Sequence, residues 1–265
     1  MSETVRLEQN DGVFHIEMAR PEKKNALTAG MYQIMADALA SAEADPAVQV
    51  ILISGAGGNF TAGNDLTDFT DQPPMDESAP VYRFIEGFSR LQKPFVAAVE
   101  GVAIGVGTTM LLHCDLVYAG SGARFALPFA NLGLTPEAAS SLLLPLCAGH
   151  ARAAEMLMLG EAFPAQVALD AGIVNAVLPD GQVLDHALER CRKLTTQPAA
   201  SLRLTKQLMK RAQQALIRET MNVEADVFRQ RLLSPEAKEA FAAFFAKRKP
   251  DFSKFNRAGR QETGC

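Results

Sequence analysis

The sequence predicts an α/β fold built around a parallel sheet, and three features of the chain support this class. Apolar runs at residues 48–53, interrupted only by Gln49, and at residues 95–99 are typical of strands that are covered on both faces. Loops of small residues and segments with helical spacing of their apolar residues, such as 27–44, alternate with these runs. The repeated order of strand, loop and helix implies crossover connections between parallel strands.

Individual elements of the first half follow from local patterns. The turn sequence Asn10-Asp11-Gly12 joins two short runs, residues 5–9 and 13–18, and predicts a β-hairpin. Thr28 is a helix-start signal for the amphipathic segment 27–44. Further along, we expect helices over residues 82–91 and 108–113, and strands over residues 95–99, 116–119 and 124–126.

The second half of the chain is mainly helical in pattern. Thr135, Pro136 and Glu137 form a helix-start sequence, because a hydroxyl can cap the N-terminus, proline suits the first turn and an acid suits the positive end of the dipole. This start predicts a helix over residues 138–147. We then expect helices over 151–159 and 164–171, a strand over 173–177 and an almost entirely helical stretch over 183–247.

Composition argues against several classes of protein. Hydrophobic residues make up 48% of the chain and charged residues 21%, and a formal net charge of -4 gives no reason to expect a nucleic-acid partner. No run of about 18 apolar residues exists, so no membrane span is expected. The N-terminal sequence lacks an apolar signal region, which predicts a cytoplasmic protein. The four cysteines lack C-x-x-C spacing and are interpreted as reduced thiols: Cys114, Cys147, Cys191 and Cys265.

Two loops of small residues have the composition to present backbone N–H groups to an anion. They comprise residues 62–65 and 105–107, where glycine permits conformations in which amides point outward. Two converging donors are the minimum for an oxyanion hole. Glycine-rich turns are also common between strands and helices, and neither loop has the spacing of a phosphate-binding P-loop or a dinucleotide motif.

Other chemical groups are sparse. The histidines lack metal-ligand spacing, so no metal site is predicted: His15, His113, His150 and His186. Glu137 is the single carboxylate in residues 124–145, a pattern that suits a helix start as well as catalysis. Lys23 and Lys24 form a small basic spot that suits a solvated loop until an anion is placed nearby.

Six segments of the chain, in one order, resemble motifs of the crotonase (enoyl-CoA hydratase/isomerase) superfamily: RPEKKNALT, FTAGNDL, AAVEGVAIGVG, CDLVYAG, LGLTPEAASS and EMLMLGEAFPAQVALDAGIVNAVLP. The resemblance covers almost the whole chain. It implies a ββα spiral core with a coenzyme A thioester site over residues 1–197. It also implies a C-terminal helical trimerisation region over residues 198–265, and therefore a homotrimer or a dimer of trimers.

The resemblance also implies roles for particular residues. The N–H groups of Asn64 and Val106 correspond to the oxyanion donors of the family. Lys23 and Lys24 would lie near the nucleotide end of coenzyme A, together with the segment Ala62, Gly63, Asn64, Asp65 and Leu66. No separate cofactor is implied, because coenzyme A is part of the substrate.

The chain departs from the hydratases of this family at two positions. Those enzymes carry two glutamates where this sequence has Thr109 and Phe129. Hydration needs an activated water together with a proton delivered to carbon, and two carboxyl groups suit that work. Their replacement argues against an efficient hydratase. Phe129, with Leu127 and Leu132, is instead expected to form a dry wall around the reacting atoms.

The segment PFANLGLTPEAASS resembles the peroxisomal-type Δ3,Δ2-enoyl-CoA isomerases, in which the glutamate after T-P or S-P is the lone base. By this resemblance Glu137 is the base of an isomerase that converts 3-enoyl-CoA to 2-enoyl-CoA in fatty-acid oxidation. We expect burial to raise the pKa of Glu137 more than a helix N-terminus lowers it. The open alternatives are another crotonase-type enolate reaction, such as enoyl-CoA hydration, and a catalytically dormant acyl-CoA-binding trimer scaffold.

Overall fold

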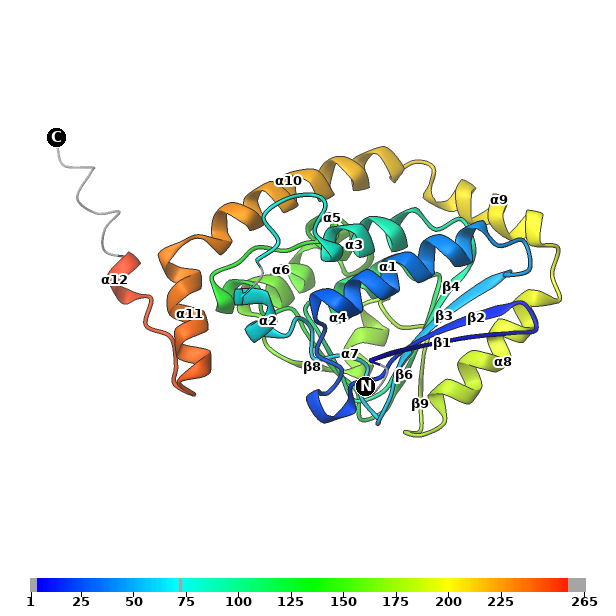
Figure 1. Cartoon of the computed structure of the whole chain (residues 1–265), viewed down its shortest axis with the longest axis horizontal. Helices are drawn as coiled ribbons and strands as arrows, with labels where there is room; N and C mark the ends of the chain where they lie inside the picture. Colours follow the sequence, from blue (N-terminus) through cyan, green and yellow to red (C-terminus); the bar gives the residue numbers. More distant parts are fainter. Residues whose placement is uncertain (1–3, 72, 257–265) are drawn as a thin grey trace.

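A six-stranded sheet forms the centre of the computed structural model, which describes residues 4–71 and 73–256 (Figure 1). Its strand order is β1-β2-β3-β4-β6-β9. After the antiparallel β1–β2 hairpin the paired strands are parallel, which confirms the predicted sheet and its crossovers. The strands are β1 (Val5–Asn10), β2 (Val13–Met18), β3 (Val50–Gly55), β4 (Phe95–Val99), β6 (Leu116–Gly120) and β9 (Ala176–Leu178).

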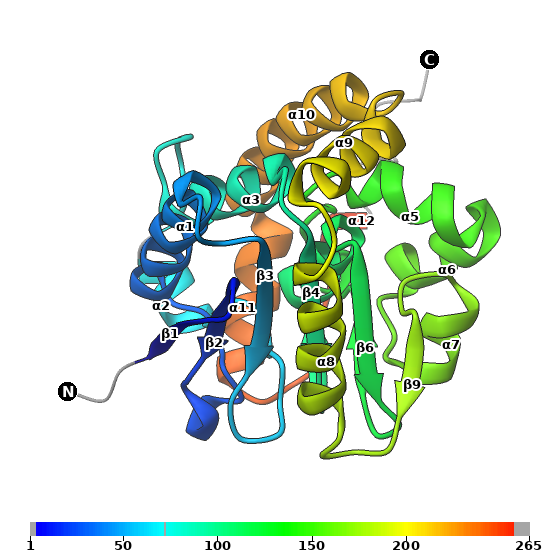
Figure 2. The same cartoon turned by 90° about the vertical axis from the view of Figure 1, so that its right-hand side faces the viewer.

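The central strands are buried on both faces. In β3, Ile51 and Ile53 belong to one apolar cluster, whereas Val50 and Leu52 belong to another on the opposite face. Because successive side chains point to opposite faces, a strand with two covered faces reads as an unbroken apolar run. Figure 2 shows one covering helix, α8, in front of the sheet. The covering helices are α1 (Ala29–Ala44) and α3 (Pro80–Arg90) on the first face, and α8 (Val183–Thr195) on the second.

A second sheet of three strands, ordered β5-β7-β8, carries one of the two small-residue loops. The strand β5 leads through Gly105 directly into the four-residue helix α4. The elements of this part of the chain are β5 (Val102–Ile104), α4 (Val106–Thr109), β7 (Arg124–Ala126), α5 (Ser140–Ala148), α6 (His150–Leu159), β8 (Phe163–Pro164) and α7 (Ala165–Asp170), with 3₁₀ turns at Met110–His113 and Ala130–Leu132.

The last helices of the chain cross the core and extend beyond it (Figure 1). They are α9 (Ala199–Lys210), α10 (Gln214–Leu232), α11 (Pro235–Phe245) and α12 (Ser253–Asn256). Lys206 of α9 is buried, with its Nζ 2.6 Å from a carboxylate oxygen of Asp115 and 2.7 Å from the carbonyl oxygen of Lys93. A buried ammonium group requires such partners, so these contacts hold α9 on the core.

The predicted helix start at Thr135 is wrong. The helix α5 begins three residues after Glu137, and the two residues between them, Ala138 and Ala139, have φ values of 56° and 55°. The N–H group of Ala139 and the first free N–H group of α5 are bound by the carboxylate of Glu224, which comes from α10. A distant side chain therefore replaces the local cap, and Glu137 does not sit on a helix N-terminus.

Two smaller differences from the predicted elements have local causes. The strand expected over residues 173–177 forms at Ala176–Leu178, because Ile173 and Val174 are buried in the turn that follows α7. A short helix, α2 (Leu66–Asp71), forms where the sequence indicates only a loop. A six-residue helix is too short to show helical periodicity, and it is capped by Asp65, whose Oδ1 accepts a hydrogen bond from the Thr67 N–H at 3.1 Å.

Within the described ranges, no helix has both the length and the apolar character needed to cross a membrane. In the same ranges Cys114, Cys147 and Cys191 are free thiols. Residues 1–3 and Cys265 lie outside the described residues, and so does part of the predicted C-terminal region. The cytoplasmic location and the domain boundary after residue 197 stay predictions.

The two small-residue loops touch because glycines leave room at their contact. A Cβ atom added to Gly63, which has a φ of +83°, would lie 2.8 Å from the carbonyl oxygen of Ile104. A Cβ atom on Gly107 would lie 2.5 Å from the Cγ2 methyl group of Thr61. That methyl group cannot move aside, since Thr61 is fully buried and its hydroxyl donates to the Asn25 carbonyl at 2.7 Å. Close approach of the loops therefore depends on glycine.

Gly107→Ala is expected to destabilise the protein by about 1–3 kcal/mol, because the added methyl group overpacks the contact between the loops. Thr61→Ser removes the opposing methyl group but keeps the hydroxyl, so the double variant should recover at least about 1 kcal/mol of that loss. Urea unfolding of both single variants and the double variant provides the cycle. Losses that simply add in the double variant would contradict the proposed contact.

Candidate active site

One cavity of about 570 Å³ brings most of the predicted site residues together. Glu137, Asn64 and Val106 line it, although they come from three separate parts of the chain. Lys24 does not line it; this residue is exposed, and its carbonyl accepts a hydrogen bond from the Ala62 N–H at 2.9 Å. The other predicted residues on the lining are Lys23, Ala62, Gly63, Asp65, Leu66, Phe129 and Leu132.

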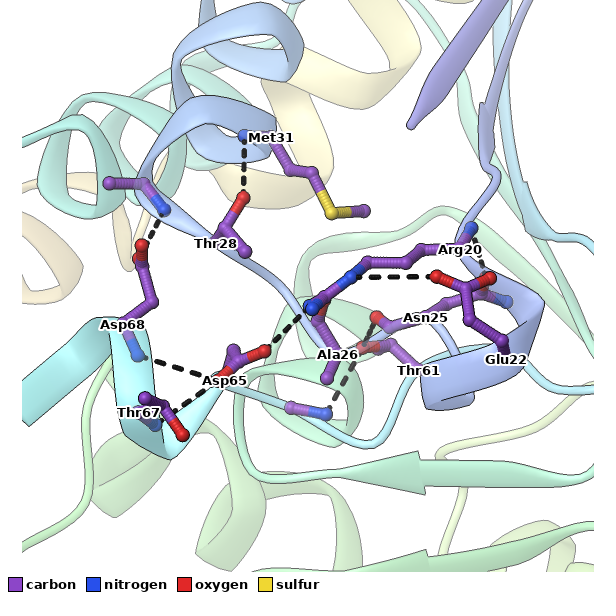
Figure 3. A network of polar contacts seen from close by, with 12 residues as sticks. Arg20, Glu22, Asn25, Ala26, Thr28, Met31, Thr61, Asp65, Thr67 and Asp68 are labelled. Atoms are coloured by element: carbon purple, nitrogen blue, oxygen red, sulfur yellow. Dashed lines mark hydrogen bonds and ion pairs between the residues drawn. The ribbon is translucent and has the colours of Figure 1, made fainter. Parts of the chain in front are cut away.

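An ion pair fixes the segment that carries Asn64 (Figure 3). The Nη1 atom of Arg20 lies 2.6 Å from Oδ2 of Asp65, and both side chains are largely buried. Although burial acts to raise the pKa of Asp65, the hydrogen bond from Arg20 and those from backbone N–H groups lower it overall. Asp65 is therefore held as an anion that pairs with Arg20 and caps α2. These contacts fix the backbone directly after Asn64.

The backbone N–H groups of Asn64 and Val106, both on the cavity lining, lack an acceptor within the described part of the chain. Leu27 forms backbone hydrogen bonds with both neighbours of Asn64: its carbonyl accepts from the N–H of Asp65, and its N–H donates to the carbonyl of Gly63. The N–H of Asn64 takes part in neither bond. Val106 is the first residue of α4, and its N–H has no partner within the helix. Among residues 4–71 and 73–256, neither N–H finds a hydrogen-bond acceptor. Both are available to an acceptor atom of a ligand.

The side chain of Asn64 is held by Tyr32, which the sequence did not indicate. The Tyr32 hydroxyl of α1 donates a hydrogen bond to Oδ1 of Asn64. Burial, together with the charges of Glu137 and Asp68, raises the pKa of Tyr32 well above its usual range, so the hydroxyl remains a donor. In the sequence, Tyr32 is one more position of an amphipathic helix, and no local pattern distinguishes it.

Glu137 is a buried ionisable group with a strongly shifted pKa. Its Oε1 accepts a hydrogen bond from the hydroxyl of Thr109. Burial raises the pKa of Glu137 to about 8; the charge of Glu224 acts in the same direction, and the Thr109 hydrogen bond opposes both. Burial dominates, as expected from the apolar sequence around it. The residue also lines a second cavity of about 980 Å³, which has residues of α3, α9 and α10 on its walls.

The C-terminal helices complete the apolar wall of the first cavity. Phe228 of α10 and Phe244 of α11 line it together with Phe129. The ring of Phe228 packs edge-on against Phe69 of α2, with 6.2 Å between the ring centroids. No local sequence pattern indicates Phe228 or Phe244 as a site residue, because both reach the cavity through the tertiary fold alone.

Metal binding finds no support in the part of the chain that the structure describes, where no group of three or more His, Cys, Asp or Glu side chains could hold an ion. His113 has a structural contact instead. Its Nε2 lies 2.7 Å from the carbonyl oxygen of Ala138, which can only accept, so this nitrogen carries the proton. Burial lowers the pKa of His113 to about 4, and the ring is neutral.

Comparison with known sequences places this arrangement in a family. The sequence profile of the family described as enoyl-CoA hydratase/isomerase matches residues 8–256. The 1,2-epoxyphenylacetyl-CoA isomerase of Escherichia coli K12 is 34% identical over 96% of this chain and 99% of its own length. The enoyl-CoA delta isomerase 2 of Rattus norvegicus is 35% identical over 94% of this chain, which spans 65% of the rat protein.

Solved structures share the fold as well. OdaA of Pseudomonas aeruginosa is 48% identical with a TM-score of 0.89, over 92% of this chain and 99% of that one. An enoyl-CoA hydratase/isomerase from Pseudoalteromonas atlantica T6c is 39% identical with a TM-score of 0.90, over 95% of this chain and 100% of that one. These similarities confirm the predicted crotonase fold. With the profile match, they show that the chain belongs to the enoyl-CoA hydratase/isomerase family of the crotonase superfamily.

Proposed function

We propose that the protein is a Δ3,Δ2-enoyl-CoA isomerase, which converts 3-enoyl-CoA to 2-enoyl-CoA in fatty-acid oxidation. The observation that carries this proposal is one buried carboxyl group of raised pKa, Glu137, on a cavity that also holds two unpartnered backbone donors. Asp65, the other acid on that lining, is already paired with Arg20. The rat relative named as an enoyl-CoA delta isomerase supports the same reaction.

The proposed reaction moves one proton through one carboxyl group. The thioester carbonyl accepts hydrogen bonds from the N–H groups of Asn64 and Val106, and ionised Glu137 removes a proton from C2. The electron pair delocalises onto the thioester oxygen to form a dienolate. Glu137 then returns a proton to C4, and the double bond forms between C2 and C3. Substrate and product are isomers, so no cofactor beyond the coenzyme A of the substrate is required.

The cavity suits the charge that develops during this reaction. The two amides bind the dienolate oxygen more strongly than the neutral carbonyl, and one such donor typically contributes about 3 kcal/mol. Phe129, Leu132 and Phe228 exclude water from the anion. In this proposal Lys23, which is exposed on the lining, pairs with the anionic nucleotide end of coenzyme A.

Hydration is the weaker candidate for this site. Thr109 stands where hydratases of the family carry a glutamate, and its hydroxyl is engaged with Glu137. Phe129 replaces the second glutamate with a buried apolar ring, so this position offers no carboxyl group to a water. Hydratases are nevertheless among the relatives, including the 2,3-dehydroadipyl-CoA hydratase of Escherichia coli K12 at 30% identity. A dormant acyl-CoA scaffold would gain nothing from burying Glu137, because burial of a carboxyl group destabilises its ionised form.

Replacing Glu137 by Gln is expected to lower kcat about 10²- to 10⁴-fold, because the variant lacks the group that removes and returns the proton. Binding of a saturated acyl-CoA should be retained, since the cavity keeps its shape. The measurement is the absorbance of conjugated thioester formed from a 3-enoyl-CoA, with hydration of a 2-enoyl-CoA followed in parallel.

The matched control is Glu189→Gln, which removes an exposed acid on α8 that lines neither cavity. This variant should keep the activity of the wild-type protein. Retention of most activity in Glu137→Gln would remove Glu137 as the base. Hydration that exceeds isomerisation in the wild-type protein would favour the alternative reaction.

The pH dependence of kcat/KM should follow the ionisation of Glu137. The base acts in its ionised form, so kcat/KM should rise with pH and level off above about 8, the raised pKa of this group. The Thr109 hydroxyl favours the ionised form, so Thr109→Val should move the inflection to higher pH, whereas Thr109→Ser should leave it in place. Rates measured between about pH 6 and 9 test this, and a flat profile would contradict it.

We also propose that the C-terminal helices assemble the protein as a homotrimer or a dimer of trimers. Large apolar side chains are exposed on α9 and α10: Leu204, Leu208, Met209, Leu216 and Val223. An apolar surface of this kind is typical of subunit interfaces. Light scattering should therefore give the mass of three or six chains, and Leu208→Glu should lower it. A wild-type monomer at micromolar concentration would contradict the assembly.

A further inference from the structure

Glu224 of α10 reaches the chain directly after Glu137. One of its carboxylate oxygens accepts hydrogen bonds from the N–H and the hydroxyl of Ser141 at 2.9 and 2.5 Å, and the other accepts from the N–H of Ala139 at 2.6 Å. The residue is buried, with 7% of its surface exposed. Burial raises the pKa of Glu224, and the hydrogen bonds from Ser141 and Ala139 oppose this effect because they favour the carboxylate and fix it in place.

The turn that Glu224 binds has an unfavourable backbone. Ala138 and Ala139 both adopt left-handed φ values of 56° and 55°, which alanine avoids unless its surroundings impose them. His113 donates to the Ala138 carbonyl on the other side of the turn, and Ser140 donates to the carbonyl of Glu137 from its N–H and its hydroxyl. These contacts determine the direction in which the Glu137 side chain leaves the backbone.

We propose that Glu224 is a positioning residue for Glu137: it locks the turn at Ala138 and Ala139, which directs the Glu137 carboxyl group into the cavity shared with Asn64 and Val106, and it places a second negative charge close to that group. This inference rests on the proposed role of Glu137 as the base and deepens it. It also makes the C-terminal helix α10 part of the machinery of the site.

Several titratable groups surround Glu137. One of them, Glu224, is an acid whose charge raises the pKa of Glu137. Burial is the largest cause of that raised pKa, and the charge of Glu224 adds to it. Burial raises the pKa of Tyr32 on α1 and of Tyr82 on α3, and the charge of Glu137 adds to both shifts. Among the cations, the guanidinium group of Arg229 lies over the ring of Tyr82, 5.5 Å from its centroid.

Two more groups complete the charged surroundings of the turn. The neutral ring of His113 binds the Ala138 carbonyl, and Lys210 of α9 donates to the carbonyl of His113 at 3.0 Å. None of these groups holds the backbone N–H groups that follow Glu137. Removing the charge of Glu224 should therefore lower the pKa of Glu137 and, at the same time, loosen the turn at Ala138 and Ala139.

The test compares Glu224→Gln with Glu224→Asp and with Glu219→Gln, an exposed acid on the same helix. The titration of Glu137 is read by infrared difference spectroscopy in substrate-free protein, with its carboxyl band assigned by its absence in Glu137→Gln. In Glu224→Gln the inflection should move to lower pH and kcat should fall about 10- to 100-fold. Its KM should stay within about twofold of the wild-type value.

The other variants separate charge from geometry. Glu224→Asp keeps the charge on a shorter side chain, so kcat should fall while the inflection stays near the wild-type value, and Glu219→Gln should change neither. An inflection in Glu224→Gln that coincides with that of the wild type would overturn the inference. If Glu224→Gln does not fold, as judged by circular dichroism, an unchanged kcat in Glu224→Asp would overturn it.

The infrared measurement needs no substrate and so separates the two proposals. A downward shift in Glu224→Gln, in a protein without isomerase activity, would refute the proposed function and support the coupling of Glu224 to Glu137. An unchanged inflection in Glu224→Gln, in a protein that isomerises 3-enoyl-CoA, would support the proposed function and refute the coupling of Glu224 to Glu137.

Discussion

Burying the carboxyl group of Glu137 disfavours its ionised form, and the neighbouring residues either strengthen or oppose this effect. Desolvation raises the pKa to about 8, which suits the proposed role of this group as the base. The hydroxyl of Thr109 opposes the shift, and the charge of Glu224 strengthens it. Three parts of the chain therefore set the basicity of Glu137: the segment before α5 that carries it, α4 and α10.

The donors across the cavity depend on backbone rather than on side-chain chemistry. Gly63 and Gly107 allow two loops to touch, and the pair of Arg20 and Asp65 holds the loop that carries Asn64. A donor that is fixed before the substrate arrives needs no reorganisation when charge develops on the thioester oxygen. In the polar network of Figure 3, Arg20, Asn25 and Thr61 do not line the cavity, and they support the loops from the side away from it.

Much of the fold could be predicted from the chain itself. The two-faced burial of β3 produces an apolar run that only a covered strand explains, and Thr28 caps α1 as its sequence pattern indicates. The start of α5 could not be predicted, because its N–H groups are satisfied by Glu224, which lies 83 to 85 residues away in the sequence. Local capping rules consider only neighbours, and here a distant carboxylate overrides them.

The sequence alone determined the α/β class and the positions of the two small-residue loops, since these depend on local composition and spacing, while the resemblance to the crotonase superfamily indicated Glu137 as the carboxylate to examine. Only the tertiary structure decided that Glu137 precedes its helix, that Tyr32 holds Asn64, and that Phe228 and Glu224 reach the site from α10. The physical reason is that burial, and with it a pKa or an unpartnered donor, arises from all the segments packed around an atom.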